Sequence, residues 1–288
     1  MTDDANVLGS YLRARREQVA PETVGLPKAG LRRVPGLRRE EVAMLAGISA
    51  DYYLRLEQGR DRHPSEQVLR SLGRVLQLDA AATDYLLGLG AAPPPRRRRR
   101  PRREVVPEGT RTLLGTLPLP AFVEGRCFDV LAANRLAVAL SPRLAPGGNR
   151  LRDLFLDPAE QALYGDWERA AAALVAGFRA SVGTDVDDPR GIELVGELSL
   201  ASELFRTLWA RHDVVRWRSS PVVLHHPQVG ELRLLREKLA LTGVTGQLLV
   251  MYHAEPGTEH ADKLALLSSY ALPDGEPTRI ASRADVTS

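Results

Sequence analysis

The 288-residue sequence has one cysteine, few aromatic residues and no long apolar run, and each shortage excludes a class of protein. The single thiol, Cys127, cannot form an intramolecular disulfide, which fits a reducing compartment. No uncharged apolar stretch reaches the roughly 18 residues that a membrane span needs. The polar start, Met1 to Asn6, has no signal-peptide core behind it. We therefore expect a soluble, cytoplasmic protein that does not enter a membrane.

Motifs of common enzymes are also missing. The sequence has no Gly-x-Ser-x-Gly elbow, no phosphate-binding Gly-Lys-Ser/Thr loop and no Gly-x-Gly-x-x-Gly turn. His225 and His226 are adjacent on an expected strand, so their side chains point to opposite faces and cannot bind one metal. Cys127 is expected on a strand too, without a second thiol for zinc. The sequence predicts no catalytic residue, no metal site and no enzymatic activity.

The net charge of +3 conceals one strongly basic segment. Residues 93–103 read PPPRRRRRPRR, with seven arginines and no acid, whereas residues 104–288 carry 19 basic and 24 acidic side chains. Consecutive prolines and mutually repelling arginines predict an extended, solvated linker. We therefore divide the chain into an N-terminal domain (1–92), a basic linker (93–106), a second domain (107–272) and a flexible tail (273–288).

The N-terminal domain has the spacing of five short helices. Val68, Leu69, Leu72, Val75 and Leu76 form one apolar stripe of period 3.6. Around them the sequence supplies helix caps and breakers at Ser49, Ser65, Asp79 and Gly47. The pattern predicts a compact all-α unit.

The segment Leu37–Gly59, LRREEVAMLAGISADYYLRLEQG, predicts two helices joined by a turn at Gly47. Tyr53 and Leu56 lie three apart and face the core of the second helix. The outward face then carries Ala50, Asp51, Tyr52 and Arg55. An exposed helix N-terminus of this kind fits the major groove of DNA.

With the run EEVAMLAGIS…YLRLEQGR…PS, residues 8–90 resemble the Xre/lambda-repressor family of helix-turn-helix regulators. The resemblance implies a five-helix fold, Ser49–Gln58 as the recognition helix and a homodimer on roughly palindromic double-stranded DNA. The stretch Pro21–Gly36 is longer than the typical connection, and it either contacts the DNA backbone or loops out.

Chemistry assigns roles to the candidate DNA-binding residues, which are Arg39, Ser49, Ala50, Asp51, Tyr52, Arg55, Arg60 and Arg62. The arginines are expected on phosphates, while Ala50, Asp51 and Tyr52 are the candidates for base edges. The alternatives are that Asp51 only serves the helix N-terminus and that Tyr52 is a surface aromatic. Glu57 would repel phosphate, so we expect a structural ion pair there. The arginine run either lies along DNA or only separates the domains.

The second domain mixes strand and helix patterns. A hairpin is expected from Ala121–Glu124 and Cys127–Leu131 with Gly125-Arg126 as its turn, and a long helix is expected to begin at Asp157-Pro158. Further helices are expected at Asn134–Leu140, after Asp188, after Ser202 and around Leu264 and Leu267, and strands at Val222–Leu224, Glu231–Leu235 and Gln247–Tyr252. This order predicts an α+β domain with an antiparallel sheet.

The runs AFVEGRCFDVLAAN, LFLDPAEQALYGDWE and SELFRTLWARHDV followed by HHPQVGELRL resemble the MmyB-type ligand-binding domain. The resemblance implies a PAS-like domain with an apolar pocket for a small, fatty-acid-like ligand. It also implies regulation of DNA binding by that ligand.

The candidate ligand-binding residues are Phe122, Phe128, Asn134, Phe155, Phe178, Arg179, Phe205, Trp209, Arg211 and His212. The aromatic members would line an apolar pocket, or they are plain core. The polar members would receive a carboxylate head, although Arg211 and His212 could equally form an ion-pair cluster with Asp213. In a rival interpretation, the second domain is only an oligomerisation or protein-partner module.

Overall fold

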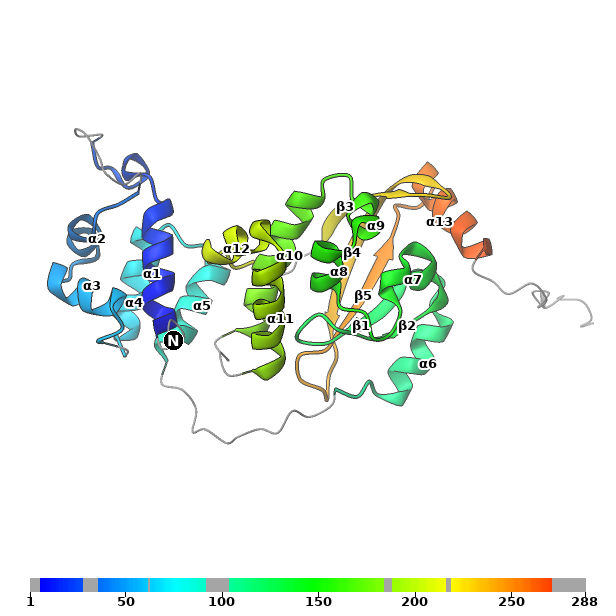
Figure 1. Ribbon diagram of the computed structural model, residues 1–288, viewed down its shortest axis with the longest axis horizontal. Coiled ribbons are helices and arrows are strands. Elements are labelled where there is room, and N and C mark those ends of the chain that lie inside the picture. The colour runs from blue at the N-terminus through cyan, green and yellow to red at the C-terminus, as the bar shows by residue number, and fades with distance from the viewer. Residues whose placement is uncertain are drawn as a thin grey trace, which may run out of the picture.

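A computed structural model of the chain describes residues 6–27, 36–61, 63–91, 104–183, 188–215 and 219–270. Figure 1 shows a helical N-terminal unit beside a larger C-terminal unit in which helices surround one sheet. This is the combination of an all-α domain and an α+β, PAS-like domain that the sequence predicts. Across those residues, none of the helices has the length and apolarity that a membrane span requires.

The N-terminal unit is built from α1 (Val7–Gln18), the 3-10 helix η2 (Pro21–Val24), α2 (Arg39–Ala46), α3 (Ala50–Glu57), α4 (Glu66–Val75) and α5 (Ala80–Gly90). The predicted caps are confirmed, because Ser49, Ser65 and Asp79 each accept a hydrogen bond from the backbone N–H three residues on. Gly47 adopts φ +71 and ends α2, a conformation that its missing Cβ permits.

The C-terminal unit contains α6 (Glu108–Thr116), β1 (Ala121–Glu124), β2 (Val130–Ala133), α7 (Arg135–Leu140), η3 (Pro142–Leu144), α8 (Arg150–Leu156), α9 (Pro158–Leu163), α10 (Trp167–Val182), α11 (Pro189–Ala201), α12 (Glu203–Ala210), β3 (Ser220–His226), β4 (Gly230–Ala240), β5 (Leu248–His253) and α13 (Glu259–Tyr270). The helices predicted after Asn134, Asp188 and Ser202 are confirmed, each capped by that side chain.

The five strands form one antiparallel sheet in the order β2-β1-β5-β4-β3. Strand β1 of the first hairpin therefore pairs with β5, the last strand in the sequence, so the centre of the sheet joins residues that are far apart in the chain. Phe122 and Val250 are cross-strand partners on the face that packs against α7 and α13. Val123 and Leu249 are partners on the opposite face, which packs against α6 through Leu114.

The first hairpin differs from its prediction. Its second strand begins at Val130, so Cys127 lies in a five-residue connection and not on a strand. The reason is a competing set of long-range hydrogen bonds. Arg150 N donates to Phe128 O at 3.0 Å, and Asn149 Nδ2 donates to Cys127 O at 2.8 Å. Phe128 adopts φ +65 as a result of this path.

The long helix expected from Asp157 is also wrong, because two helices take its place. Asp157 caps α9 as predicted, but α9 ends at Leu163 and Asp166 caps a new helix, α10. Between them Tyr164 forms a bridge with Leu224, and Gly165 N donates to Val223 O at 3.3 Å. A backbone that pairs with β3 cannot continue a helix, which explains the break.

A buried carboxylate joins the sheet to the helices. Glu124 on β1 is fully buried and pairs with Lys238 on β4 and with Arg150 on α8, whose Nη1 lies 2.8 Å from its Oε2. Burial raises the pKa of Glu124, but the charges of Lys238 and Arg150 outweigh that effect and leave the pKa lowered. The carboxylate is therefore held ionised between two cations.

Replacing this carboxylate should destabilise the fold strongly. In Glu124→Gln both cations face an uncharged amide, and breaking a buried pair costs about 3–5 kcal/mol. Chemical denaturation followed by circular dichroism measures the loss. Glu231→Gln is the matched control, because Glu231 pairs with Arg233 on the exposed side of β4 and should change little. Equal, small effects of the two substitutions would contradict this account.

Candidate functional site

Helices α2 and α3 form a helix-turn-helix on the side of the N-terminal unit that faces away from the C-terminal unit (Figure 1). Ala43 is buried where the helices approach, and Ile48 N donates to Ala43 O at 3.0 Å across the turn. Tyr53 and Leu56 are fully buried, as the spacing predicts. The first turn of α3 is left pointing outward.

The candidate residues on this helix lie where the sequence places them. Ser49 caps α3 by accepting from Tyr52 N at 3.1 Å, so its hydroxyl has a structural role. Ala50, Asp51 and Arg55 are exposed, and Tyr52 is half-buried against the core. Of the other candidates, Arg60 is exposed just after α3, Arg39 begins α2, and Arg62 lies outside the described residues.

Two of the candidates pair with each other. The Arg55 guanidinium forms an i,i+4 ion pair with the Asp51 carboxylate, and it lies 5.7 Å from the centre of the Tyr52 ring. Both partners are largely exposed, so the pair stabilises the helix by only about 0.3–0.5 kcal/mol. Such a weak pair can separate when a phosphate or a base edge offers itself to either side chain.

Glu57 is structural, as predicted. Its carboxylate is fully buried, with Oε1 2.6 Å from Arg16 Nε and Oε2 2.6 Å from Arg39 Nε. Arg16 Nη1 also donates to Leu37 O at 2.9 Å. One carboxylate thus fastens the end of α3 to α1 and to the start of α2. Arg39 keeps 42% of its side chain exposed, so it can still approach a phosphate.

Sequence reasoning missed Arg16, although a signal was present. Leu8, Leu12 and Arg16 follow one another at four-residue steps, and all three are buried on the inner face of α1. A cation on an apolar stripe requires a buried acid, and Glu57 is that acid.

The long connection and the basic linker lie largely outside the described residues. Of the stretch Pro21–Gly36, residues 28–35 are not described, while its beginning forms η2. The arginine run of 93–103 is not described either. Their contacts with DNA stay predictions.

In the C-terminal unit, one aromatic cluster contains most of the candidate rings. Phe205 lies at its centre, stacked on Trp209 with ring centroids 5.8 Å apart and edge-on to Phe155 at 5.3 Å. Phe178 contacts Phe128 at 5.6 Å and Trp209 at 5.9 Å. The rings come from α8, α10, α12 and the hairpin connection, and leucines of α11 cover them.

Two other candidates belong elsewhere. Phe122 packs in the sheet cluster against Tyr252, with centroids 6.4 Å apart, and not with the other phenylalanines. Asn134 caps α7 and also receives a hydrogen bond from Ala121 N and donates to Leu119 O. Its amide is thus occupied with backbone partners, which corrects the expectation that it receives a ligand.

The three remaining polar candidates lie at the junction of the two units. Arg211 is exposed and pairs with Asp213 at 2.9 Å, which is the structural alternative that the sequence left open. His212 is half-buried, and burial lowers its pKa to about 3 with help from the charges of Arg179 and Arg15. Arg179 is buried, and its guanidinium carbon lies 3.7 Å from the Trp209 ring centre.

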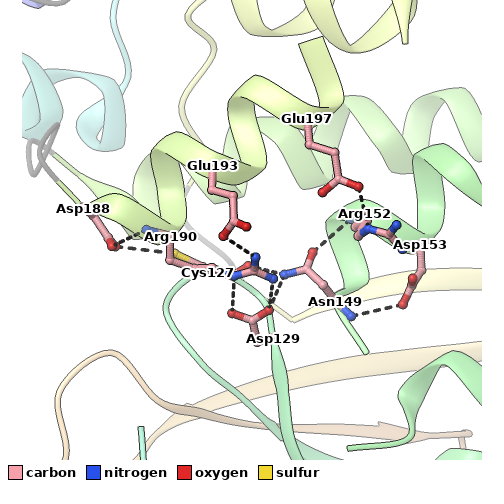
Figure 2. A network of polar contacts seen from close by, with 9 residues as sticks. All are labelled: Cys127, Asp129, Asn149, Arg152, Asp153, Asp188, Arg190, Glu193 and Glu197. Carbon is pink, nitrogen blue, oxygen red and sulfur yellow. Dashed lines mark hydrogen bonds and ion pairs between the residues drawn. The ribbon is translucent and has the colours of Figure 1, made fainter. Parts of the chain in front are cut away.

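A polar network surrounds α11, the hairpin connection and α8 (Figure 2). The Arg190 guanidinium donates to both oxygens of Asp129, at 2.8 and 3.3 Å, and Arg152 Nε lies 2.7 Å from Glu197 Oε1. Asn149 Nδ2 donates to Asp129 as well, at 2.8 Å. These contacts tie α11 to the hairpin connection and to α8, so its leucines stay seated on the rings.

Cys127 belongs to the same network, and its thiol is buried. Its thiol contacts the Asp188 carboxylate at 3.5 Å, and burial together with that carboxylate raises its pKa to about 12. His225 is exposed and His226 is buried, so they face opposite sides of β3 as predicted. Within the described part of the chain, no group of three metal-ligating side chains could hold a metal ion.

The rings of the aromatic cluster are buried or half-buried and packed against one another in this structure. One surface hollow lies along α4, and another lies between the units and is lined by Arg15, Asp79, Ala173, Arg211 and Val215 among others. Neither hollow is lined by the rings of the cluster. A ligand that enters the cluster would therefore have to displace packed side chains.

Comparison with known families assigns both units. Residues 106–267, more than half of the chain, match the family described as MmyB-like transcription regulator ligand binding domain. Residues 7–86 match a family described as helix-turn-helix domain. No curated protein matches the sequence.

Removing the Glu57 carboxylate should unfasten the helix-turn-helix. Glu57→Gln leaves the buried Arg16 guanidinium beside a neutral amide, and we expect a loss of about 3 kcal/mol in the free energy of unfolding. Guanidinium titration measures it. The control Glu66→Gln breaks an exposed pair with Arg70 on α4 and should cost less than about 1 kcal/mol. If both variants unfold alike, Glu57 does not organise this unit.

Substitutions of the two members of the Asp51–Arg55 pair should have different effects on DNA binding. Arg55→Ala should weaken binding to every sequence and reduce the slope of log affinity against log salt by about 1. Asp51→Ala should instead alter base preference and raise non-specific affinity, because it releases Arg55. Fluorescence anisotropy at several salt concentrations measures both, with exposed Arg111→Ala on α6 as control. An unchanged salt slope in Arg55→Ala would remove the phosphate assignment.

Proposed function

Because this chain belongs to the family with the MmyB-like ligand-binding domain and is a DNA-binding helix-turn-helix transcription regulator, we propose that a small, fatty-acid-like ligand in its C-terminal unit controls where its N-terminal unit binds. The observation that carries the proposal is the aromatic cluster around Phe205, which adjoins both the sheet and the junction with the N-terminal unit.

On DNA, α3 lies in the major groove with its N-terminal turn toward the bases. Ala50 contacts a thymine methyl, and Asp51 accepts from a cytosine amino group. Arg39, Arg55 and Arg60 neutralise phosphates on either side of the groove. The exposure of these side chains and the weakness of the Asp51–Arg55 pair support these roles.

The acyl chain of the ligand replaces ring-to-ring contacts in the cluster. Phe155 and Trp209 are its outermost rings, at 7% exposure and half-buried respectively, and both contact Phe205. Edge-to-face and stacked pairs contribute about 0.5–1.5 kcal/mol beyond area burial, which the burial of about two to three methylene groups offsets. A tightly packed cluster is therefore compatible with an induced pocket.

The regulator acts as a homodimer, which places two recognition helices on one roughly palindromic site. A ligand changes the output only if its affinity differs between two placements of those helices. We expect the presence or absence of the ligand to affect the N-terminal unit through Arg179, which stacks on Trp209 at the junction.

The tight packing of the cluster also agrees with a second function, in which the C-terminal unit only binds other protein chains. Ile192 and Leu200 lie on the outer face of α11 with 51% and 88% of their surface exposed, eight residues apart around exposed Gly196. An apolar ridge of this kind suits a second copy of the chain or a partner protein.

Native mass spectrometry of the full chain decides between these functions. With dodecanoate added, the regulated protein retains one acyl chain per subunit and its melting temperature rises. Phe205→Trp fills the cluster and should weaken dodecanoate binding by at least about tenfold. Phe122→Trp overpacks the separate sheet cluster and is the matched control. If only bare protein is detected and dodecanoate does not raise the melting temperature, the C-terminal unit is an interaction module and not a ligand sensor.

A further inference from the structure

The N-terminal unit docks on the end of the C-terminal unit formed by α10, α12 and the residues after α12 (Figure 1). Arg15 Nη1 on α1 lies 2.7 Å from Asp213 Oδ1, and Gln18 Nε2 donates to Arg211 O at 2.7 Å. The Tyr11 ring meets the His212 ring edge-on, with centroids 6.1 Å apart. These contacts place α1 directly against the C-terminal unit.

The apolar cores of the two units are continuous at this junction. Val214, which follows α12, is 7% exposed and is buried in the same cluster as Tyr11, Leu12 and Leu86 of the N-terminal unit. Ala180 of α10 packs against that cluster too. The docked placement is therefore stabilised by burial of apolar surface as well as by polar contacts.

Arg179 lies between this junction and the aromatic cluster. It is 4% exposed, its guanidinium stacks on the Trp209 ring at 3.7 Å, and its Nη2 donates to Trp209 O at 2.5 Å. Burial lowers the pKa of Arg179, and the phenol groups of Tyr85 and Tyr11 in the N-terminal unit act in the opposite direction. Arg179 thus holds the end of α12, and the residues that follow, His212–Val214, contact the N-terminal unit.

A continuous stack leads from the centre of the cluster to this cation. Phe155 packs edge-on against Phe205, Phe205 is stacked on Trp209 with an angle of 11° between the rings, and Trp209 carries Arg179. The guanidinium of Arg179 rests on the Trp209 ring, which in turn is stacked on Phe205. A displacement of Phe205 that moves Trp209 therefore changes the surface against which the guanidinium packs.

The junction is also incompletely hydrogen-bonded. In the described residues, Arg15 Nε, Arg179 Nε and His212 Nδ1 are buried without a hydrogen-bond partner. Arg179 forms no ion pair with a carboxylate among those residues. Unsatisfied buried polar groups oppose docking, so they offset part of the stabilisation that the apolar and polar contacts of the junction supply.

We propose that Arg179 is the residue that positions the N-terminal unit, and that its stacking on Trp209 makes this placement depend on what occupies the aromatic cluster. The proposal rests on the proposed ligand-controlled function for its second part only. Because α3 faces away from the junction (Figure 1), docking leaves the recognition helix open and fixes its direction relative to the C-terminal unit. In a dimer, that direction sets the spacing of the two recognition helices.

Electron spin resonance distance measurement on the full chain tests the placement. Spin labels at Met44→Cys on α2 and Leu200→Cys on α11, both exposed, report it in a Cys127→Ser background. Labelled chains are diluted with an excess of unlabelled Cys127→Ser chains, so that only distances within one chain are measured, and the parent protein should then give one narrow distance distribution. Arg179→Met keeps the apolar stem but removes the guanidinium, and the ratio of docked to released molecules should fall roughly tenfold.

Two further variants separate positioning from folding. Tyr85→Phe removes only the N-terminal hydroxyl that favours the charged form of Arg179, and it should broaden the distribution in the same direction. Arg233→Met breaks an exposed pair with Glu231 on β4, away from the junction and from both labels, and should leave the distribution unchanged. Circular dichroism melting of each variant identifies any that fails to fold.

Dodecanoate completes the experiment. It should shift the distances of the parent protein toward those of Arg179→Met, while the variant still binds dodecanoate in native mass spectrometry and shows no further shift. Absence of bound dodecanoate would overturn the ligand-controlled function, whereas the distances of the unliganded variants still decide the role of Arg179. Parent-like distributions in both Arg179→Met and Tyr85→Phe would overturn the positioning proposal.

Discussion

A carboxylate buried between two cations organises each unit of this protein. Glu57 joins Arg16 and Arg39 at the end of the recognition helix, and Glu124 joins Arg150 and Lys238 where the sheet meets α8. An ion taken out of water loses several kcal/mol of hydration, so it persists only where the fold brings opposite charge to it from distant segments. Each carboxylate therefore enforces one arrangement of three elements. The helix-turn-helix and the sheet depend on that constraint for a fixed geometry.

The candidate functional surfaces contain solvent-exposed ion pairs in place of buried ones. Asp51 and Arg55 pair in water on the exposed face of α3, where the pair contributes little and can be exchanged for DNA contacts. On α11, the partly exposed pairs of Arg190 with Asp129 and Arg152 with Glu197 hold a helix over the aromatic rings without burying charge. Strong buried pairs fix the scaffold, and weaker exposed pairs lie where a regulator has to change partners.

The aromatic cluster differs from both kinds of ion pair. It contains no charge of its own, yet the buried guanidinium of Arg179 stacks on Trp209 and donates to the Trp209 carbonyl, directly before the residues that contact the N-terminal unit. Each ring contact is weaker than a buried ion pair, so displacing one ring costs less than separating such a pair. In the function that we propose, a change of apolar contacts in the cluster reaches the DNA-binding unit as a change in the surroundings of Arg179.

The sequence by itself determined whatever depends on neighbouring residues. Ser49, Asp79 and Asn134 cap helices because a side chain there reaches a backbone N–H three residues on, and the spacing of Tyr53 and Leu56 fixed which face of α3 is buried. Only the tertiary structure decided that α9 ends at Leu163, that Cys127 leaves the strand and that Arg16 finds Glu57. Those outcomes depend on backbone and charge partners up to 60 residues away, such as Val223 for Gly165 and Asn149 for Cys127. Local propensity carries no information about such partners, because a hydrogen bond or ion pair is specified only when the chain brings both groups together.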